Sequence, residues 1–231
     1  MSERPVLIIG NRNYSSWSLR AELALAAGGI ERECKLIQLD TETSRAELLE
    51  NSPSAKVPAL RIGDVAVWES LAIAEWAAER SPELWPADDR LRAHARSASA
   101  EMHAGFAGIR SDMPMNIRGR FPGVGHSERA LRDARRILDL WSQARQLSGN
   151  ATFLYGDTFG VADAMYAPVV TRFMTYGVEL DDEMRGYCEA VCRFPAMAQW
   201  IAEATNESWI CEVSEPSSPR WTGGPLSVLS V

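Results

Sequence analysis

Histidine and cysteine are scarce in this chain, and their scarcity excludes most metal centres. The 231 residues include three histidines and four cysteines. No two cysteines form a C-x-x-C pair, and no histidine stands at metal-ligand spacing from a cysteine. We therefore expect no metal site, and we interpret the cysteines as reduced, buried thiols. These residues are Cys34, Cys188, Cys192, Cys211, His94, His103 and His126.

Long apolar runs are also absent. No stretch is long enough to span a membrane as a helix. The polar residues 1–5 and the short apolar run at 6–9 do not make a secretion signal, so we expect a cytoplasmic protein. Basic residues are fewer than acidic ones, and the net charge is therefore -7. This charge disfavours binding to the phosphates of a nucleic acid. We expect neither nucleic acid nor a membrane as a partner.

What is present is the composition of a globular protein, with 46% hydrophobic and 24% charged residues. Residues 1–80 alternate between strand and helix patterns. The predicted elements are a strand at 6–9, a helix ending near 27, a strand around 34–36, a short helix at 44–50, a hairpin of 57–60 and 65–68, and a helix at 71–80. This βαβαββα order predicts an α/β domain.

The rest of the chain is helical in character. Prolines and tryptophan interrupt the pattern at 81–87, and we interpret that segment as a linker between the domain at 1–80 and an all-helical domain at 88–231. The tail from Glu212 lacks periodicity, and we expect it to be irregular. The helices are predicted near 88–112, 127–148, 161–176, 181–192 and 195–205.

Pro58 opens a predicted strand, where a proline cannot donate a hydrogen bond to the sheet. An edge strand or a bulge accounts for it in the simplest interpretation. If the Val57–Pro58 bond is cis, however, the N–H and C=O of Val57 turn outward and can pair with an extended peptide ligand.

Glu69 and Ser70 stand at the start of the predicted helix at 71–80. Ser70 is a suitable helix cap, which is the simpler interpretation. A helix N-terminus also attracts an anion, and Glu69 beside it can bind an ammonium group. The pair therefore suits the two charged ends of an amino acid.

A cluster of hydroxyl groups follows the first strand, in the string Y-S-S-W-S-L-R at 14–20. Hydroxyls at a helix N-terminus can stabilise a thiolate, because they donate hydrogen bonds and the helix dipole favours negative charge. No G-x-S-x-G motif surrounds these serines and no histidine is nearby in the sequence, which excludes a hydrolase serine. A plain capping cluster is the alternative.

The element order, the serine string, the V-P-A-L turn at 57–60 and the E-S pair together resemble the glutathione transferase family. The resemblance covers nearly the whole chain, and it implies a thioredoxin-like N-terminal domain and a helical C-terminal domain. It also implies glutathione as the co-substrate. Val57 and Pro58 would hold its cysteinyl backbone, and Glu69 and Ser70 its γ-glutamyl end.

The serine string is similar to the S-S-C-S-x-R signature of zeta-class transferases and maleylacetoacetate isomerases. In that signature the first serine activates the thiol, which implies Ser15, with Ser16 as the second candidate and Tyr14 as the third. Trp17 stands where the signature has cysteine, and this departure argues against a specific assignment to the isomerase reaction.

Further residues take roles only by resemblance. Lys56 and Arg20 are candidates for contacts with the glutathione carboxylates, with surface charges as the alternative. Gly160 replaces the capping hydroxyl of the family's folding motif, and we interpret Asp163 as structural because it can still reach back to the Gly160 N–H. The electrophile pocket is expected between the domains, with the candidates Met102, Phe106, Arg110, Met113 and Met115.

The resemblance implies a glutathione S-transferase in which Ser15 donates a hydrogen bond to the thiolate, which attacks a small electrophile. A glutathione-dependent cis–trans isomerase is one alternative, and a binding protein without catalysis is another. Because members of the family are commonly dimers, the resemblance also implies a homodimer. No pattern in the sequence of the helical domain identifies the electrophile.

Overall fold

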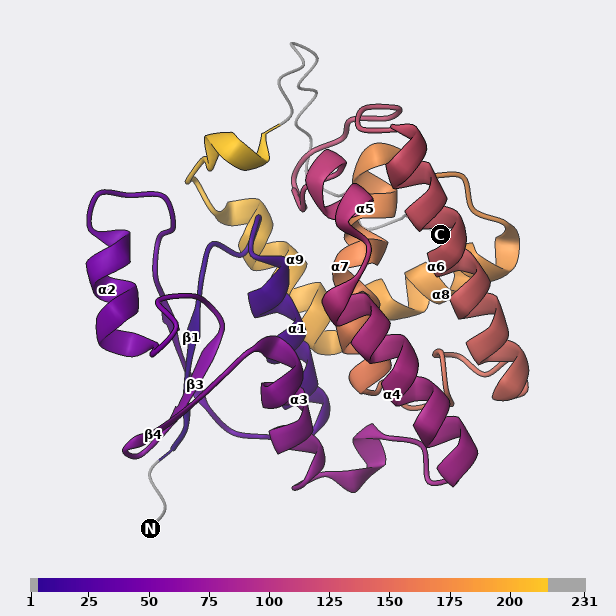
Figure 1. Cartoon of the computed structure of the whole chain (residues 1–231), viewed down its shortest axis with the longest axis horizontal. Coiled ribbons are helices and arrows are strands. Elements are labelled where there is room, and N and C mark those ends of the chain that lie inside the picture. The colour runs from indigo at the N-terminus through magenta and orange to yellow at the C-terminus, as the bar shows by residue number, and fades with distance from the viewer. Residues whose placement is uncertain (1–3, 216–231) are drawn as a thin grey trace.

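The computed structural model describes residues 4–215, which form a four-stranded sheet followed by a set of helices (Figure 1). The strand order is β2-β1-β3-β4. The first crossover is parallel, from β1 to β2, whereas β3 is antiparallel to both β1 and β4. The elements are β1 (Val6–Ile9), α1 (Ser16–Ala27), β2 (Glu33–Leu36), α2 (Ser44–Asn51), β3 (Ala59–Ile62), β4 (Val65–Trp68) and α3 (Ser70–Ala78). The predicted βαβαββα order is confirmed.

The alternation of side chains along β1 assigns the two faces of the sheet. Leu7 and Ile9 belong to the large core, together with residues of α1 and α3. Ile8 points to the opposite face, where it packs with Ile37 and Leu48 in a small separate cluster beneath α2. All three strand residues are fully buried, so β1 lies between two helical layers.

The helical half of the described chain starts after a short 3-10 turn, η1 (Pro82–Leu84), which falls within the linker predicted at 81–87. The exact positions of the domain boundaries stay a prediction. A second 3-10 turn, η2 (Glu212–Ser214), occurs in the segment expected to be irregular. The helices are α4 (Asp89–Ala104), α5 (Ala107–Asp112), α6 (Glu128–Leu147), α7 (Val161–Tyr176), α8 (Asp182–Arg193) and α9 (Pro195–Asn206). Among the described residues, none of the helices is both long and apolar enough to cross a membrane.

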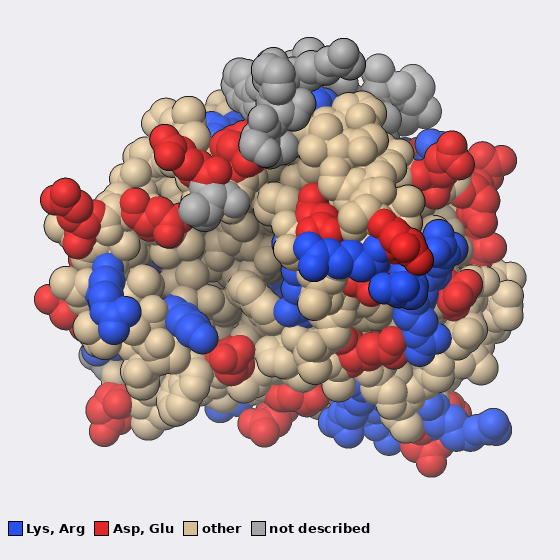
Figure 2. Space-filling model, turned by 45° about the horizontal axis from the view of Figure 1, so that its top comes forward, with Lys and Arg blue, Asp and Glu red and all other residues tan. Residues whose placement is uncertain are grey.

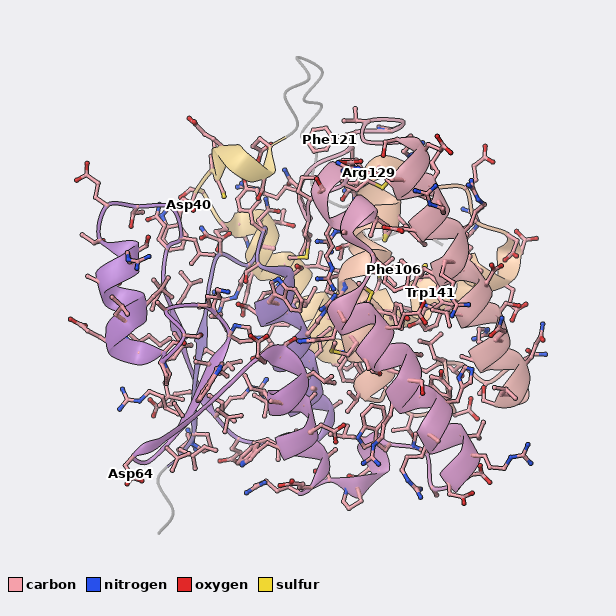
Figure 3. All side chains as sticks on the ribbon, viewed as in Figure 1. Asp40, Asp64, Phe106, Phe121, Arg129 and Trp141 are labelled. Atoms are coloured by element: carbon pink, nitrogen blue, oxygen red, sulfur yellow. The ribbon has the colours of Figure 1, made fainter. Side chains whose placement is uncertain are left out.

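The single helix predicted over 88–112 is wrong, because the chain breaks between α4 and α5. Phe106 adopts left-handed backbone angles, with φ of 60°, which a continuing α-helix does not allow. At Gly105, a Cβ atom would lie 2.8 Å from the carbonyl oxygen of Glu101, so the close approach requires glycine. Phe106 itself is buried in the helical half (Figure 3). After the break, α5 packs against α6.

Asp163 stabilises the N-terminus of α7, the most buried of the described helices, through hydrogen bonds. Its carboxylate accepts hydrogen bonds from the N–H of Gly160 (2.9 Å) and of Leu154 (3.1 Å) and from the hydroxyl of Tyr187 (3.2 Å). The predicted contact between Asp163 and the Gly160 N–H is therefore confirmed, with Gly160 as the N-cap. Burial raises the pKa of Asp163 to about 6.

We expect Asp163→Ala to lower the free energy of unfolding by about 2–4 kcal/mol, because buried donors lose their acceptor. Urea unfolding measures this change. Asp157→Ala is the matched control, since Asp157 lies in the loop before α7 and, in the described part of the chain, accepts hydrogen bonds only from Thr152. Equal stability of the two variants would contradict the assignment of Asp163 as a structural residue.

Candidate functional site

The carboxyl end of β1 opens into a hollow between the sheet and the helical half, which we call the interdomain cleft. Its volume is about 460 Å³. The surface is visibly hollowed there, and Lys and Arg side chains border the hollow (Figure 2). It is lined by residues 14–17, 39, 40, 44, 48, 55–57, 110, 114, 115, 172 and 214. Residues from both halves of the chain therefore meet in this cleft.

Ser15 is the N-cap of α1, and its hydroxyl oxygen belongs to a short chain of hydrogen bonds. The Gly10 N–H donates to the Ser18 hydroxyl oxygen at 3.0 Å, and the two serine hydroxyls lie 2.7 Å apart. The Ser18 N–H also donates to the Ser15 oxygen, at 3.4 Å. Because Ser18 already accepts from Gly10, its own hydroxyl hydrogen is available for Ser15. Either hydroxyl can be the donor of this pair, and when Ser18 donates, the hydrogen of Ser15 is free to point into the cleft.

Ser16 and Tyr14 line the same cleft but are placed differently. Ser16 is the first residue of α1 and is half-buried. The Tyr14 hydroxyl donates to Glu215 and accepts a hydrogen bond from Arg118 at 3.0 Å. Burial, and then the carboxylate of Glu215, raise the pKa of Tyr14. Its hydrogen is therefore committed to Glu215 and is not available to a ligand.

A smaller hollow of about 200 Å³ adjoins the first, and we call it the proline-loop cleft. The Val57–Pro58 bond in its wall is cis, as the sequence left open. Among the described residues, no backbone hydrogen bond uses the N–H or C=O of Val57. Both groups are therefore available to an extended ligand. The cleft is lined by Trp17, Ser54, Lys56, Val57, Pro58 and Glu69.

Glu69 and Ser70 connect this hollow to the N-terminus of α3. Glu69 has a positive φ of 70°, an uncommon conformation for a residue other than glycine. Ser70 is fully buried, and its hydroxyl has no hydrogen-bond partner among the described residues. An unpartnered buried hydroxyl beside the free N–H groups of a helix is suited to an anion, and the half-exposed Glu69 carboxylate to a cation.

The structure thus brings six of the seven predicted site residues to the two clefts. Ser15 and Ser16 line the interdomain cleft, and Pro58 and Glu69 line the proline-loop cleft. Lys56 and Val57 line both. Ser70, the seventh residue, lies buried at the start of α3 and lines neither cleft.

The guanidinium groups of Arg20, Arg110 and Arg172 form a cluster beside the interdomain cleft. Sequence reasoning named Arg20 and Arg110 separately, but it missed Arg172 and the gathering of the three groups. The surface position considered for Arg20 is wrong, because this side chain is 2% exposed. Its Nε and Nη1 have no partner among the described residues. Burial, followed by the charges of Arg110 and Arg172, lowers the pKa of Arg20. Helix α1 turns Arg20 inward, and no local pattern in the sequence signals this.

Arg110 and Arg172 reach the cleft itself from α5 and α7. Arg172 donates to the carbonyl oxygen of Met113 at 2.8 Å, and burial lowers its pKa to about 10. Neither residue forms an ion pair with a carboxylate in the described part of the chain. The cluster therefore provides positive charge without a compensating acid, which favours an anionic ligand.

Trp17 separates this cluster from the proline-loop cleft. The guanidinium carbons of Arg20 and Arg110 lie 4.5 and 4.6 Å from the centre of its ring. The ring of His103 contacts it edge-on, at 5.3 Å between centroids. Trp17 is therefore held from both halves of the chain.

Two of the five residues expected in a pocket between the domains line the interdomain cleft. Arg110 and Met115 do line the interdomain cleft. Met102, Phe106 and Met113 belong instead to the hydrophobic core, where each is at most 7% exposed. Apolar residues at helical spacing are more often core than ligand contacts, and these three follow that rule.

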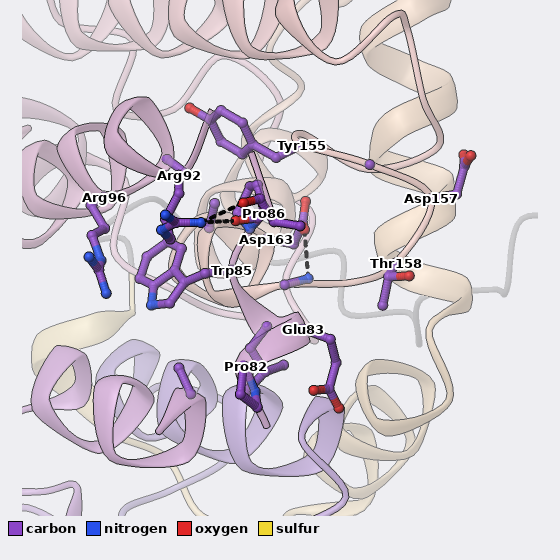
Figure 4. A pocket seen from close by; sticks show the side chains of 17 residues that line it. Pro82, Glu83, Trp85, Pro86, Arg92, Arg96, Tyr155, Asp157, Thr158 and Asp163 are labelled. Carbon is purple, nitrogen blue, oxygen red and sulfur yellow. Dashed lines mark hydrogen bonds between the residues drawn. The ribbon is translucent and has the colours of Figure 1, made fainter. Parts of the chain in front are cut away.

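A further cavity of about 590 Å³ lies at the linker, beneath α7 (Figure 4). None of the predicted site residues lines it. Two of its polar side chains are engaged locally. Arg92 donates to the carbonyl oxygens of Pro86 (2.9 Å) and Ala87 (2.7 Å), and Asp163 accepts from Gly160. This cavity is therefore larger than the interdomain cleft but is not the candidate site.

Comparison with known proteins identifies relatives of both halves of the chain. The family description "Glutathione S-transferase, N-terminal domain" matches residues 14–80, and "Glutathione S-transferase, C-terminal domain" matches residues 125–203. A probable maleylacetoacetate isomerase of Caenorhabditis elegans is 36% identical over 46% of this chain and 49% of its own length. The maleylacetoacetate isomerase of Rattus norvegicus is 28% identical over 77% of this chain and 82% of its own.

Solved structures share the fold. A glutathione transferase homolog from Burkholderia, with bound glutathione, has a TM-score of 0.65 at 22% identity, covering 88% of this chain and 98% of that one. A glutathione S-transferase from the clam Laternula elliptica has a TM-score of 0.68 at 22% identity, covering 86% and 92%. The predicted thioredoxin-like domain followed by a helical domain is thereby confirmed.

Because Ser15 caps α1, we expect Ser15→Ala to lower the free energy of unfolding by about 1 kcal/mol. Thermal or urea unfolding measures the change. Ser16→Ala is the comparison, since its hydroxyl does not cap the helix. A larger loss in Ser16→Ala than in Ser15→Ala would show that the cap is assigned to the wrong residue.

Proposed function

We propose that this protein, which belongs to the glutathione transferase family, binds glutathione across the two clefts and transfers its thiolate to a small electrophile. One observation carries the proposal. The clefts share Trp17, Lys56 and Val57, so a ligand held at Val57 extends continuously from Glu69 to Ser15. An extended tripeptide whose central residue carries the reacting thiol would therefore contact both clefts.

Each part of glutathione then has a partner of suitable chemistry. The N–H and C=O of Val57, beside the cis bond to Pro58, pair with the backbone of the cysteinyl residue. The γ-glutamyl carboxylate binds at the N-terminus of α3 with the hydroxyl of Ser70, and its ammonium group binds Glu69. Lys56 pairs with the remaining carboxylate, that of glycine.

Ser15 lowers the pKa of the bound thiol. Its hydroxyl accepts from Ser18 and donates its own hydrogen to the sulfur, while the N-terminus of α1 favours the negative charge. The thiol proton leaves to water, and the thiolate forms a carbon–sulfur bond with the electrophile. In an addition the substrate then takes a proton from water, and in a substitution the leaving group departs with the electron pair. The chain contributes position and electrostatics.

We expect Ser15→Ala to reduce the rate of glutathione conjugation by about 10²- to 10³-fold, as loss of an oxyanion-hole donor does. A spectrophotometric assay with a chromogenic electrophile measures the rate. Ser97→Ala is the control, because Ser97 is exposed on α4, lines neither cleft and, among the described residues, bonds only to the Ala93 carbonyl. Unchanged rates in both Ser15→Ala and Ser16→Ala would refute activation by a serine.

A second candidate function is the glutathione-dependent cis–trans isomerisation of a dienoic acid. The guanidinium cluster favours it, because Arg110 and Arg172 give the interdomain cleft unpaired positive charge. In this reaction the thiolate adds to the double bond, the carbon–carbon bond rotates, and elimination restores the thiolate. Relatives named maleylacetoacetate isomerase agree with it, although Trp17 replaces the cysteine of that signature.

Substrate charge separates the two functions. We expect Arg110→Met to lower kcat/KM at least about tenfold for an electrophile that carries a carboxylate, and to leave a neutral electrophile of similar size within about twofold. Arg132→Met is the control, since Arg132 lies exposed on α6, away from both clefts. Equal losses with both substrates would show that Arg110 does not select charge.

We also propose the oligomeric state and the location of the protein from its resemblance to the family. A homodimer in the cytoplasm, without nucleic acid or membrane as partner, fits the family and the net charge of -7. Sedimentation of the purified chain tests the dimer. Binding of glutathione without turnover of any electrophile would favour the third possibility, a binding protein that uses the same fold.

A further inference from the structure

The segment from Glu207 to Glu215, which we call the C-terminal strap, lies against the loop that carries Ser15. Helix α9 ends just before it, and the strap passes the upper end of β1 and α1 (Figure 1). The loop, residues 11–15, connects β1 to α1 and sets the position of the Ser15 hydroxyl. The side chain of Asp40, which lines the interdomain cleft, accepts a hydrogen bond from Cys211 of the strap at 2.7 Å (Figure 3).

Glu207 makes the central contact. One oxygen of its carboxylate accepts a hydrogen bond from the backbone N–H of Arg12 at 2.9 Å, and the other accepts from the N–H of Asn13 at 3.0 Å. Hydrogen bonds to a charged acceptor are stronger than neutral ones, and two from consecutive residues fix a peptide in one orientation. Without this carboxylate, two part-buried N–H groups would lose their partner.

Arg118 and Glu215 hold the strap in place. The guanidinium of Arg118 donates to the carbonyl oxygens of Glu207 and Trp209, and also to the Tyr14 hydroxyl of the loop. At the other end, Glu215 accepts from Tyr14 and from the amide of Asn116 at 3.0 Å. The Tyr14 hydroxyl therefore binds the strap. This contact gives Tyr14 a structural role, and the proposed chemistry does not use its hydroxyl.

The loop transmits this placement to Ser15. The backbone N–H of Ser15 donates to the Asn11 carbonyl at 2.8 Å, and that of Tyr14 donates to the same oxygen at 3.2 Å. Arg12 and Asn13, the two residues that Glu207 binds, form the bend between these partners. A shift of the bend therefore moves the Ser15 hydroxyl relative to the sulfur it is proposed to contact.

We propose that Glu207 is a positioning residue for thiol activation: it holds the loop so that the Ser15 hydroxyl is aligned with the thiol. This inference rests on the proposed function. It assigns the strap an effect mainly on the chemical step. The strap contacts the loop of Ser15 and reaches the interdomain cleft through Ser214, whereas none of its described residues lines the proline-loop cleft, where Val57 and Glu69 are proposed to hold the peptide. A displacement of about 1 Å in a catalytic group can cost about 10²-fold in rate.

The test compares three variants of the full chain by steady-state kinetics and amide hydrogen exchange. We expect Glu207→Ala to lower kcat about 10- to 100-fold, to leave KM for glutathione within about twofold, and to speed exchange of the Arg12 and Asn13 N–H groups. Glu207→Gln keeps one acceptor oxygen and should restore part of kcat. Glu203→Gln is the matched control, because Glu203 on α9 pairs with the side chain of Arg12 but not with the loop backbone.

Each outcome decides the matter. Wild-type kcat in Glu207→Ala, a rise in KM in place of the fall in kcat, or an equal loss in Glu203→Gln would overturn the inference. If Glu207→Ala does not fold, as judged by circular dichroism, the Glu207→Gln variant carries the same comparison, and a wild-type kcat there with unchanged exchange overturns it. An inactive wild-type protein would instead overturn the proposed function, so the two failures are distinguishable.

Discussion

The start of helix α1 is the constraint on which the rest of the site depends. The residues that follow strand β1 line the interdomain cleft together with the proline loop and residues of the helical half. Gly10 donates to Ser18, and when Ser18 in turn donates to Ser15, the Ser15 hydroxyl has an accepted hydrogen bond and a free hydrogen. A capping interaction that stabilises the helix thereby also orients a donor toward the cleft. The same hydroxyl therefore serves local structure and the proposed chemistry.

Charge is distributed unevenly between the whole chain and the site. The protein carries a net charge of -7, yet Arg20, Arg110 and Arg172 gather beside the cleft without a carboxylate partner among the described residues. Burying such groups is costly, and a bound anion would offset part of this cost. A thiolate near α1 and an anionic co-substrate would both supply that charge. The positive field of the site is therefore local and does not depend on the charge of the surface.

Features governed by short stretches of sequence could be predicted, and those governed by distant contacts could not. The βαβαββα order, the contact of Asp163 with Gly160 and the gathering of Val57, Pro58 and Glu69 at one cleft follow from periodicity, capping and family motifs. The break at Phe106 depends on packing, and the strap joins residues 195 positions apart, from Arg12 to Glu207. No local pattern in the sequence predicts that Arg20 is buried or that Glu207 binds the loop at 11–15.

The central claim, that the N-terminus of α1 and Ser15 activate a thiol, is tested most directly by the ionisation of bound glutathione. Thiolate absorbance in the ultraviolet, recorded against pH for the protein–glutathione complex, reports the pKa of the bound sulfur. The account predicts a midpoint at least about one pH unit below the value of about 8.5 for a free cysteine thiol. A midpoint at the value of free glutathione would contradict it.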